Sequence, residues 1–447
     1  MHLQDLTGKR VAVWGTGREG IAAVEAIAPH HPARLIAVQD RATYAATAWS
    51  GDLAAAAPLF TGDDAHRELA SVDVIVRSPG IPQVHPWIAE FRARGGVVTG
   101  GTALWMAGNA ARTIGVTGSK GKSTTTTLIH HLLAAAGRPN TLGGNIGIAV
   151  LSLPPAEQYV LELSAYQCAD LADSPRVVAL TSLFPEHLDW SGSEAGYYRD
   201  KLNVARHGAE VIVYNGADAR LEQELGGGLP LVAVNRPDSF HVTDGWVHRA
   251  GERLFPRSAL ALQGRHNESN LCVALGALEG AGIDCVAQRD VLEAALATYE
   301  QLDQRLMPIL DPSGLTFVDD TLSTIPQSAI YAIEVYADRP LTVIVGGQDR
   351  GVDYAPLRDF LAARGITATL IGIPDSGPAI LDTVKDLPGI TTVVAEDLVE
   401  AVRLGREHTP ANGTVLLSPA APSYGRFDNF EHRSRVFREA ITATAPA

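Results

Sequence analysis

Cysteine is scarce in this chain of 447 residues, which contains only Cys168, Cys272 and Cys285. The three positions are widely spaced, their number is odd, and no Cys-x-x-Cys pair occurs. A disulfide framework or a zinc site is therefore not expected, and a reducing cytoplasm fits this composition. Cys272 lies in an apolar run, where we expect a small buried side chain.

Long apolar runs are also missing. No stretch reaches the roughly 18 residues that a membrane-spanning helix needs. The first residues, Met-His-Leu-Gln-Asp-Leu, contain no basic segment followed by a long apolar run, so the sequence predicts no signal peptide. We therefore expect a cytoplasmic protein that does not insert into a membrane.

Positive charge is in the minority, because 36 Lys and Arg face 50 Asp and Glu and give a net charge of -14. Such a chain has no general attraction for a nucleic-acid backbone or an anionic membrane, and we expect no nucleic-acid partner. An anionic substrate must be held by local groups such as loop amides and single basic side chains. With 46% hydrophobic and 19% charged residues, we expect a globular protein. A monomer is a separate expectation.

Short apolar runs alternate with helical patterns along the chain, which predicts an α/β architecture with parallel sheets. At roughly 150 residues per domain, the length suggests about three domains, which we place at 1–111, 112–309 and 310–447. The second boundary depends on Asp-Pro-Ser-Gly at 311–314, strong turn chemistry that we interpret as a domain junction. The predicted strands are 10–14, 35–38, 72–76, 113–116, 159–163, 177–181, 211–214, 315–318, 341–345, 368–371 and 414–417.

A phosphate-binding loop is the strongest chemical signal. Thr-Gly-Ser-Lys-Gly-Lys-Ser-Thr at 117–124 follows a predicted strand and opens a predicted helix. Gly118 and Gly121 let backbone amides face an anion at the helix N-terminus, Lys122 can reach terminal phosphates, and Ser123 or Thr124 can offer a hydroxyl to Mg²⁺. The spacing departs from the standard phosphate loop, because the two glycines are only three residues apart. The predicted ATP-binding loop residues are Gly118, Ser119, Lys120, Gly121, Lys122, Ser123 and Thr124, with Lys120 as an additional cation.

This loop resembles the ATP loop of the Mur ligases, which build the peptidoglycan stem peptide. Further matches follow in order along nearly the whole chain, and one of them, Leu-Glu-Leu-Ser-Ala-Tyr-Gln at 161–167, is most similar to the glutamate-adding member. The resemblance implies three α/β domains: a Rossmann-like UDP-sugar domain, a central P-loop ATPase domain and a C-terminal Rossmann-like domain for the amino acid. The other matches are Gly-Gly-Asn-Ile-Gly at 143–147, Pro-Glu-His-Leu-Asp at 185–189, Gly-Arg-His-Asn-Glu-Ser-Asn at 264–270, Leu-Ser-Pro-Ala-Ala-Pro-Ser at 417–423 and Phe-Asp-Asn-Phe at 427–430.

The catalytic residues that the resemblance implies surround ATP and Mg²⁺. Glu162 ends a predicted strand, where open α/β sheets place their ligands, and a carboxylate there suits Mg²⁺. The family's pattern makes His187 a second metal ligand, although an isolated loop histidine is usually solvent-facing or structural. A lone helix lysine is normally a solvated charge, but the similar ligases carry a carbamylated lysine at the position of Lys201. The predicted catalytic residues are Lys122, Glu162, His187, Lys201 and Arg305; the metal ligands are Ser123, Glu162, His187 and Lys201; further ATP contacts are Asn267, Asn270, Arg305 and Asp320.

The first domain contains Gly-Thr-Gly-Arg-Glu-Gly at 15–20 after a strand, a Gly-x-Gly-x-x-Gly pattern. Alone it is a weak dinucleotide signal, and it is also compatible with a tight strand–helix turn and nothing more. In the resembling family this domain holds a UDP-sugar. The predicted UDP-substrate contacts are Thr16, Gly17, Arg18, Asp40, Arg41, Ser78, Pro79, Gly80 and Asn145.

The amino-acid end departs from the family's usual pattern. The family's Asn-Asp-Ser-Lys-Ala-Thr is Asp-Asp-Thr-Leu-Ser-Thr at 319–324, so Leu322 replaces a lysine. Arg350 replaces a second lysine, and its planar fork is not equivalent to a point charge. These departures look like the branch that adds L-glutamate, whose product a partner epimerase later inverts. The predicted amino-acid contacts are Thr324, Arg350, Ser423 and Phe430.

The resulting hypothesis is an ATP-dependent ligase that adds L-glutamate to UDP-N-acetylmuramoyl-L-alanine through an acyl phosphate. Its substrates are these two small molecules, its cofactors are ATP and Mg²⁺, and a glutamate epimerase is an expected functional partner. Addition of D-glutamate remains open. So do a folylpolyglutamate-type or cyanophycin-type ligase, which the UDP-sugar-like first domain disfavours, and an ATP-dependent switch or assembly protein.

Overall fold

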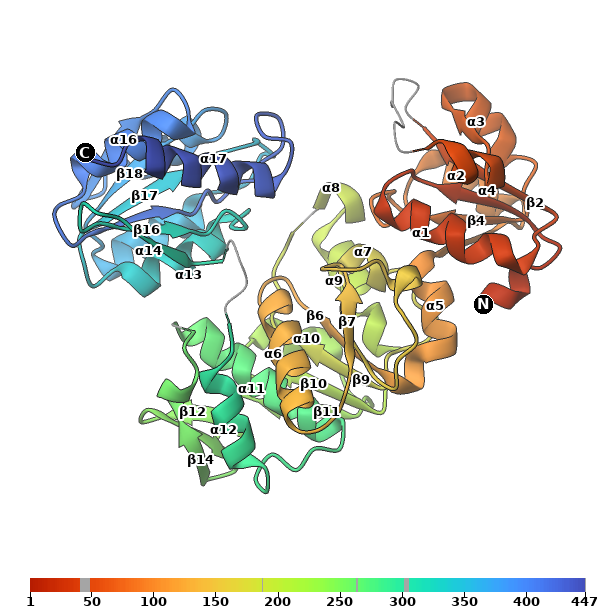
Figure 1. The fold of residues 1–447 in the computed structure, drawn as a ribbon, viewed down its shortest axis with the longest axis horizontal. Helices are drawn as coiled ribbons and strands as arrows, with labels where there is room; N and C mark the ends of the chain where they lie inside the picture. The colour runs from red at the N-terminus through yellow and green to blue at the C-terminus, as the bar shows by residue number, and fades with distance from the viewer. Residues whose placement is uncertain (41–48, 187, 263, 301–304, 447) are drawn as a thin grey trace. The chain divides into compact units, whose positions relative to one another are not determined.

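The protein is described here by a computed structural model that covers residues 1–40, 49–186, 188–262, 264–300 and 305–446. Its chain forms two compact units. The first contains Met1–Ala261 and Asn267–Tyr299, and the second contains Leu262–His266 and Glu300–Ala447. Two parallel sheets lie in the first unit, and a third, mostly parallel sheet lies in the second (Figure 1).

The N-terminal sheet has five parallel strands in the order β3-β2-β1-β4-β5. Its central strand, β1 (Arg10–Trp14), is buried at four of its five positions, as a strand covered on both faces requires. The loops that follow β1, β2 and β4 emerge at the same sheet edge, because parallel strands share one direction. The other elements are α1 (Arg18–Ile27), β2 (Arg34–Gln39), α2 (Gly51–Ala56), β3 (Leu59–Thr61), α3 (Gly62–Leu69), β4 (Val74–Arg77), α4 (Pro86–Ala93), β5 (Val97–Gly100) and α5 (Gly101–Asn109), with short 3₁₀ turns at Leu3–Leu6, Ala28–His30 and Ala110–Arg112.

The central sheet has six parallel strands in the order β11-β10-β9-β6-β8-β7. Its middle strand is β6 (Thr113–Thr117), which pairs with β8 on one side and β9 on the other. A small antiparallel sheet, β12-β13-β14, follows it. The remaining elements are α6 (Lys122–Ala135), β7 (Thr141–Gly144), β8 (Tyr159–Glu162), α7 (Ala165–Cys168), β9 (Val177–Leu180), α8 (Leu188–Ser191), α9 (Glu194–Leu202), β10 (Val211–Asn215), α10 (Ala219–Leu225), β11 (Leu231–Val234), β12 (Phe240–Thr243), β13 (Trp246–Arg249), β14 (Glu252–Pro256), α11 (Arg265–Gly280) and α12 (Arg289–Ala297), with 3₁₀ turns at Val150–Ser152, Asn203–Ala205 and Arg257–Ala259.

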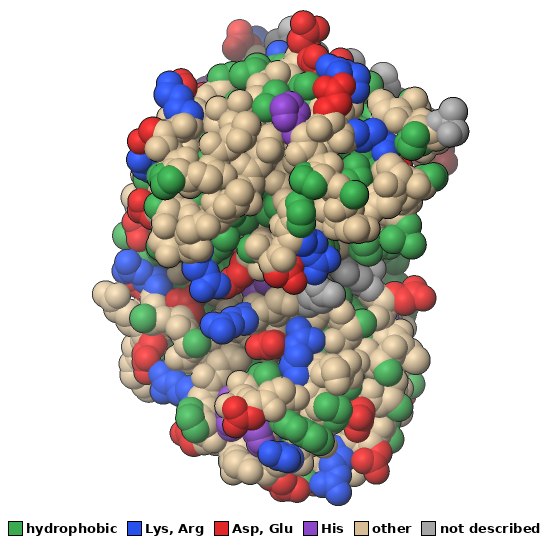
Figure 2. Space-filling view, turned by 90° about the vertical axis from the view of Figure 1, so that its left-hand side faces the viewer, with side chains coloured by type: hydrophobic (Ala, Val, Ile, Leu, Met, Phe, Trp, Pro, Cys, Tyr) green, Lys and Arg blue, Asp and Glu red, His purple; other side chains and the backbone are tan. Residues whose placement is uncertain are grey.

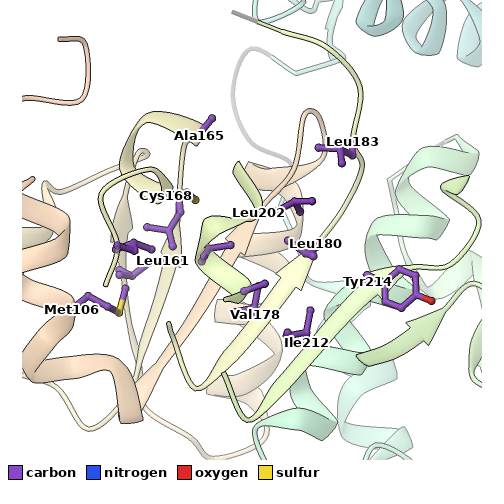
Figure 3. Packing of buried hydrophobic residues seen from close by; sticks show 14 of the residues in the cluster. Met106, Leu161, Ala165, Cys168, Val178, Leu180, Leu183, Leu202, Ile212 and Tyr214 are labelled. Atoms are coloured by element: carbon purple, nitrogen blue, oxygen red, sulfur yellow. The ribbon is translucent and has the colours of Figure 1, made fainter. Parts of the chain in front are cut away.

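One face of the central sheet is covered by α7, α9 and part of α5. Figure 3 shows Leu161 of β8, Val178 of β9 and Ile212 of β10 packed in one cluster with Leu202 of α9 and Met106 of α5. Helix α5 also places a leucine in the core of the N-terminal sheet. This helix therefore packs against two hydrophobic cores in the first unit. Its apolar residues are buried on both sides, and this burial stabilises the helix.

The C-terminal sheet has the order β15-β16-β20-β17-β18-β19, and only the β15–β16 pair is antiparallel. Strand β15 (Met307–Leu310) belongs to this sheet, although it begins before residue 310, the predicted start of the C-terminal domain. The turn at 311–314 is not a domain junction but the hairpin turn between β15 and β16, closed by a bond from the Gly314 amide to the Asp311 carbonyl. The other elements are β16 (Thr316–Asp319), α13 (Pro326–Tyr336), β17 (Leu341–Val345), α14 (Ala355–Arg364), β18 (Ala368–Gly372), α15 (Gly377–Val384), β19 (Ile390–Val394), α16 (Leu398–His408), β20 (Thr414–Leu417) and α17 (Phe430–Ala443).

The α/β class with parallel sheets is as predicted, and Cys272 is buried as expected. On the face drawn in Figure 2, acidic and basic side chains are interspersed. Among the described residues, no helix combines the length and apolar character that a bilayer crossing requires.

Candidate active site

The phosphate loop connects β6 to α6, and two glycines make its path possible. Gly118 has a φ of 151°, and a Cβ there would lie 2.0 Å from Thr181 Oγ1. Gly121 has a φ of 87°, and a Cβ there would lie 2.3 Å from Asn270 Oδ1. Both contacts are too close for any larger residue. The second contact also places Asn270 of α11 directly against the loop, and its Nδ2 donates to Asn267 Oδ1 at 3.2 Å.

Side chains at the end of β9 hold the loop in place. The Ser119 hydroxyl is buried, donates to the Phe184 carbonyl at 2.6 Å and accepts from the Phe184 amide at 2.9 Å. Thr181 Oγ1 donates to the Lys120 carbonyl at 2.6 Å, and Ser182 Oγ accepts from the Lys120 amide at 2.9 Å. Ser119 thus has a supporting role in this structure, because its oxygen is occupied by backbone groups.

Two lysines converge on one carbonyl of the loop. Lys122 Nζ donates to the carbonyls of Gly118 and Ser119, both at 3.0 Å. Lys201 Nζ, from α9, donates to the same Gly118 carbonyl at 2.8 Å. The Lys201 side chain is only 2% exposed, so the surface-charge alternative is wrong. Burial, assisted by the nearby Lys122 ammonium, lowers the pKa of Lys201 to about 7.

Lys120 and the first turn of α6 complete the basic side of the loop. Lys120 Nζ forms an ion pair with Glu186 Oε1 at 2.8 Å, so part of its charge is already balanced by a carboxylate. Ser123 is buried in the first helical turn, and Thr124 beside it is half-buried. The helix begins at Lys122, which directs its free backbone amides and positive end toward the loop.

Glu162 ends β8 and is 1% exposed. Its Oε1 accepts from Asn145 Nδ2 at 2.6 Å, whereas its Oε2 is buried with no hydrogen-bond partner among the described residues. A buried carboxylate oxygen of this kind fits a cation ligand, so Glu162 and the Ser123 hydroxyl fit a magnesium site beside the loop. No group of three acidic, histidine or cysteine side chains suited to a metal occurs in the described part of the chain. His187 lies outside the described residues.

A cavity of about 570 Å³ opens at the edge of the N-terminal sheet. The loops after β1, β2 and β4 line it together with Asn145 and Gln167 from the central part of the first unit. The hydroxyls of Thr16 and Ser78 are buried and have no hydrogen-bond partner among the described residues. These oxygens fit a polar ligand. The predicted residues in its lining are Thr16, Gly17, Arg18, Asp40, Ser78, Pro79, Gly80 and Asn145, and Arg41 lies outside the described residues.

Two charged residues of this cavity have partners. Arg18 donates from NH1 to the Gly147 carbonyl at 2.7 Å, so it joins the first loop to the segment that carries Asn145. Asp40 Oδ2 lies 3.8 Å from His85 Nε2, and partial burial lowers the pKa of His85. The cavity therefore presents one exposed cation, the carboxylates of Glu19 and Asp40, and two buried hydroxyls.

Arg305 and Asp320 belong to the second unit. Asp320 follows β16, is 7% exposed, and accepts a hydrogen bond from Ser418 Oγ at 2.8 Å. Burial raises the pKa of Asp320 to about 7, although the nearby Arg305 charge opposes that shift. Asp320 is thus a buried carboxylate that interacts electrostatically with the guanidinium groups of Arg305 and Arg433.

The predicted amino-acid contacts come from three loops of the C-terminal sheet. Arg350 is exposed, and its Nε donates to Gln348 Oε1 at 3.1 Å. Ser423 is buried, whereas Thr324, Phe430 and Leu322 are half-buried. Gly347 links two of the loops, because its φ is 154° and a Cβ there would lie 2.4 Å from the Pro422 carbonyl oxygen.

One residue that holds these loops together was not predicted from the sequence. Arg433 of α17 is fully buried. It donates from Nε to Thr321 Oγ1 at 2.8 Å, from NH2 to the Thr321 carbonyl at 2.7 Å, and from NH1 to the Ala421 carbonyl at 3.1 Å. Burial lowers the pKa of Arg433 to about 9. Nothing in the helical pattern at 430–443 distinguishes this arginine from its exposed neighbours. Gln167 was also missed as a cavity residue, although the Ser164-x-x-Gln167 capping box marked its helix start.

Comparison with known proteins agrees with this arrangement. Residues 116–278 match the Mur ligase middle domain. The chain is 60% identical to the UDP-N-acetylmuramoyl-L-alanine–L-glutamate ligase of a Micromonospora species, over 100% of this chain and 99% of that protein. It is 36% identical to the protein of the same name from Xanthomonas campestris pv. campestris, over 98% and 96% of the two chains. The chain belongs to the Mur ligase family.

This Mur ligase is therefore an ATP-dependent amide ligase, and the hypothesis of a non-enzyme switch protein is set aside. The fold comparison agrees: the crystal structure of MurF ligase from Thermotoga maritima in complex with ADP covers 99% of this chain and 100% of its own, with a TM-score of 0.56 and 16% identity. At that identity the likeness concerns the fold.

Proposed function

We propose that this Mur ligase joins L-glutamate to UDP-N-acetylmuramoyl-L-alanine in the cytoplasm, as a step in peptidoglycan precursor synthesis, and that a glutamate epimerase acts on its product. The observation that carries the proposal is a direct link between the cavity and the phosphate loop. Asn145 lines the cavity and donates to Glu162, and Glu162 lies opposite Val116 in the strand that leads into the loop. A carboxylate at the end of a ligand in the cavity would lie beside the site for the terminal phosphate of ATP.

The proposed reaction has two displacements. A carboxylate oxygen of the acceptor attacks the γ-phosphorus, the bond from phosphorus to the bridging oxygen breaks, and ADP leaves. The amino group of glutamate then attacks the acyl carbon, loses a proton, and displaces phosphate, which carries away one oxygen of the original carboxylate. Charge develops on the transferring phosphoryl group, where preorganised cations are most effective.

The residues of the site have distinct roles in this reaction. Lys122 leaves its two carbonyl contacts to neutralise the terminal phosphates, and Arg305 acts on the same group. Glu162, Ser123, His187 and carbamylated Lys201 would hold Mg²⁺, which supplies charge stabilisation to the phosphates when bound. A carbamate forms only on a neutral amine, and the lowered pKa of Lys201 supports that modification. Asn267, Asn270 and Asp320 would contact the nucleotide.

The choice of L-glutamate rests on the amino-acid loops. Leu322 offers no charge, and Arg350 can bind one carboxylate of glutamate through two parallel hydrogen bonds. Both relatives compared above carry L-glutamate in their names, which supports the same choice here. Thr324, Ser423 and Phe430 would form the rest of this pocket.

Phosphate release tests the proposal. We expect release to require ATP, Mg²⁺, UDP-N-acetylmuramoyl-L-alanine and glutamate together. L-Glutamate should exceed D-glutamate at least about tenfold in kcat/KM, which corresponds to roughly 1.4 kcal/mol. A preference for D-glutamate at saturating ATP and acceptor would make the enzyme the D-glutamate ligase. Release that needs no amino acid would contradict the ligase reaction itself.

A further inference from the structure

A buried ion pair lies behind the cavity wall. Arg77 is the last residue of β4, and its side chain is 0% exposed; Asp170 follows α7, and its side chain is 5% exposed. The contact is bidentate, from Nε to Oδ1 at 3.2 Å and from NH2 to Oδ2 at 2.7 Å. The pair joins the N-terminal sheet to the central part of the first unit. None of the roles proposed above involves it.

The rest of the guanidinium is bonded to the backbone of the cavity wall. Arg77 NH1 donates to the Ile81 carbonyl at 2.5 Å and to the Pro79 carbonyl at 3.4 Å. Arg77 NH2 donates to the carbonyl of Tyr166, the residue before Gln167. Pro79, Ile81 and Gln167 all line the cavity. One side chain therefore fixes two walls of the cavity that come from different sheets.

The same guanidinium also contacts Trp190 of α8. Its carbon lies 5.1 Å from the Trp190 ring centroid. The Trp190 ring stacks on Tyr166 at 4.5 Å, and its Nε1 donates to the Pro79 carbonyl at 3.1 Å. Trp190 lies four residues after Glu186, the ion-pair partner of Lys120 in the phosphate loop. The Arg77 cluster thus connects the cavity wall to the segment next to the loop.

The surroundings of Asp170 are equally specific. Gln83 Nε2 donates to Asp170 Oδ1 at 2.9 Å and to the Ala169 carbonyl at 3.0 Å. A Cβ at Gly100 would lie 2.7 Å from Asp170 Oδ2, so the carboxylate occupies space that only glycine leaves open. Burying two charges is costly, and well-packed apolar residues would often stabilise a fold as well. A fully bonded buried pair is therefore better explained by the geometry it imposes than by stability.

We propose that Arg77, paired with Asp170, is a positioning residue that shapes the acceptor cavity and couples its 78–82 wall to Trp190. The inference rests on the proposed function, because it assigns the cavity to the UDP-linked acceptor. Arg77 does not touch the reacting atoms. It acts through the Pro79 and Ile81 carbonyls on one side and through Trp190 on the other.

Steady-state kinetics of the full-length enzyme test this inference. We would compare Arg77→Met, Arg77→Lys and Trp190→Phe with wild type, and measure UDP binding by calorimetry without ATP. Trp190→Phe keeps the aromatic stacking and removes only the hydrogen bond to Pro79, so it is expected to fold even if Arg77→Met does not. The matched control is Arg10→Met, which breaks an exposed pair with Asp73 in the same sheet (side chains 52% and 37% exposed).

We expect the KM for the UDP-linked acceptor to rise about tenfold or more in the Arg77 variants and a few-fold in Trp190→Phe, because small displacements of binding groups have large kinetic effects. The KM for ATP should stay within about twofold, and Arg10→Met should match wild type. Unchanged acceptor KM and UDP affinity in Trp190→Phe and Arg77→Lys would overturn the inference, as would a rise in both KM values together. If wild type itself neither binds UDP nor uses the acceptor, the proposed function fails instead.

Discussion

The loop after β6 in the central sheet and the loop after β17 in the C-terminal sheet have similar glycine conformations, but the basic side chains around them differ. Gly118 after β6 and Gly347 after β17 both have strongly positive φ and both press against a neighbouring loop. Around the first loop the cations are lysines, and Lys201 is buried. Around the second they are arginines, one exposed at Arg350 and one buried at Arg433.

This difference concerns the protonation state of the two buried cations, Lys201 and Arg433. Burial brings the pKa of Lys201 to about 7, so its amine can be neutral and can react. Burial also lowers the pKa of Arg433, but only to about 9, so that guanidinium keeps its charge and its five donors near neutral pH. Under the proposed function, the same backbone arrangement would serve phosphate transfer in the central sheet and a fixed amino-acid pocket in the C-terminal sheet.

The largest effect is expected at Lys122. Lys122→Ala should lower kcat by at least about a hundredfold, because one preorganised cation facing developing phosphate charge is lost. The fold should persist, since the ammonium contacts only loop carbonyls. Phosphate release under saturating substrates measures the effect. Lys385→Ala, which removes an exposed lysine paired with Asp382, is the control and should retain wild-type activity. Near-normal turnover of Lys122→Ala would show that Lys122 does not stabilise the transferring phosphate.

Lys201→Ala should lower kcat by about a hundredfold, and short-chain carboxylates should restore part of the activity by occupying the space of a carbamate. Wild-type activity should also fall when carbon dioxide is depleted or when the pH drops below about 7, because the protonated amine cannot hold a carbamate. The measurement is the rate of phosphate release with and without added bicarbonate. Full activity of the alanine variant would place Lys201 among structural residues.

In the C-terminal region we expect an effect on stability. Arg406 binds Asp311 through two contacts of 2.7 Å and holds the pKa of that buried carboxyl well below its usual range. A lowered carboxyl pKa stabilises the fold above about pH 4, and this contribution is lost as the pH falls further. Asp311→Asn should therefore lower the unfolding free energy by about 2 kcal/mol at pH 7 and by somewhat less near pH 3, because the carboxyl of the folded protein is still ionised at pH 3.

Calorimetric unfolding at both pH values measures that difference. Asp375→Asn, which breaks an exposed pair with Arg426, is the matched control and should change stability by less than about 1 kcal/mol. An unfolding free energy of Asp311→Asn equal to that of wild type at pH 7 would show that the Asp311 charge contributes nothing.

The smallest effect concerns Arg350. Arg350→Lys should reduce kcat/KM for L-glutamate by about tenfold and narrow the preference over D-glutamate, because a point charge no longer fixes the plane of one carboxylate. The KM for ATP should not change. Arg364→Lys, on an exposed arginine of the same unit paired with Glu334, is the control. Unaltered kinetics with L- and D-glutamate in Arg350→Lys would show that Arg350 does not bind the glutamate carboxylate.

The sequence predicted the parts of this fold that depend on local patterns. Buried apolar runs located the inner strands of the three larger sheets, but the less buried edge strands and the small sheet β12–β14 were not predicted. The glycine–lysine pattern located the phosphate loop. The turn at 311–314 was misplaced because turn chemistry is the same in a hairpin and in a linker. The burial of Lys201 could not be predicted from its helix, because the two preceding residues are charged as well. Arg199 and Asp200 form an ion pair in which the Arg199 side chain is exposed. Arg433 and the Arg77–Asp170 pair depend on contacts between distant segments, which no local pattern contains.

The proposed reaction makes its most direct prediction about one oxygen atom. UDP-N-acetylmuramoyl-L-alanine labelled with ¹⁸O in its carboxylate would be turned over with ATP and L-glutamate, and the phosphate analysed by mass spectrometry. Attack of that carboxylate on the γ-phosphorus transfers one oxygen, so each phosphate should contain one ¹⁸O atom from a fully labelled acceptor. Phosphate without label would mean that the acceptor carboxylate never bonds to phosphorus, and would contradict the acyl-phosphate route.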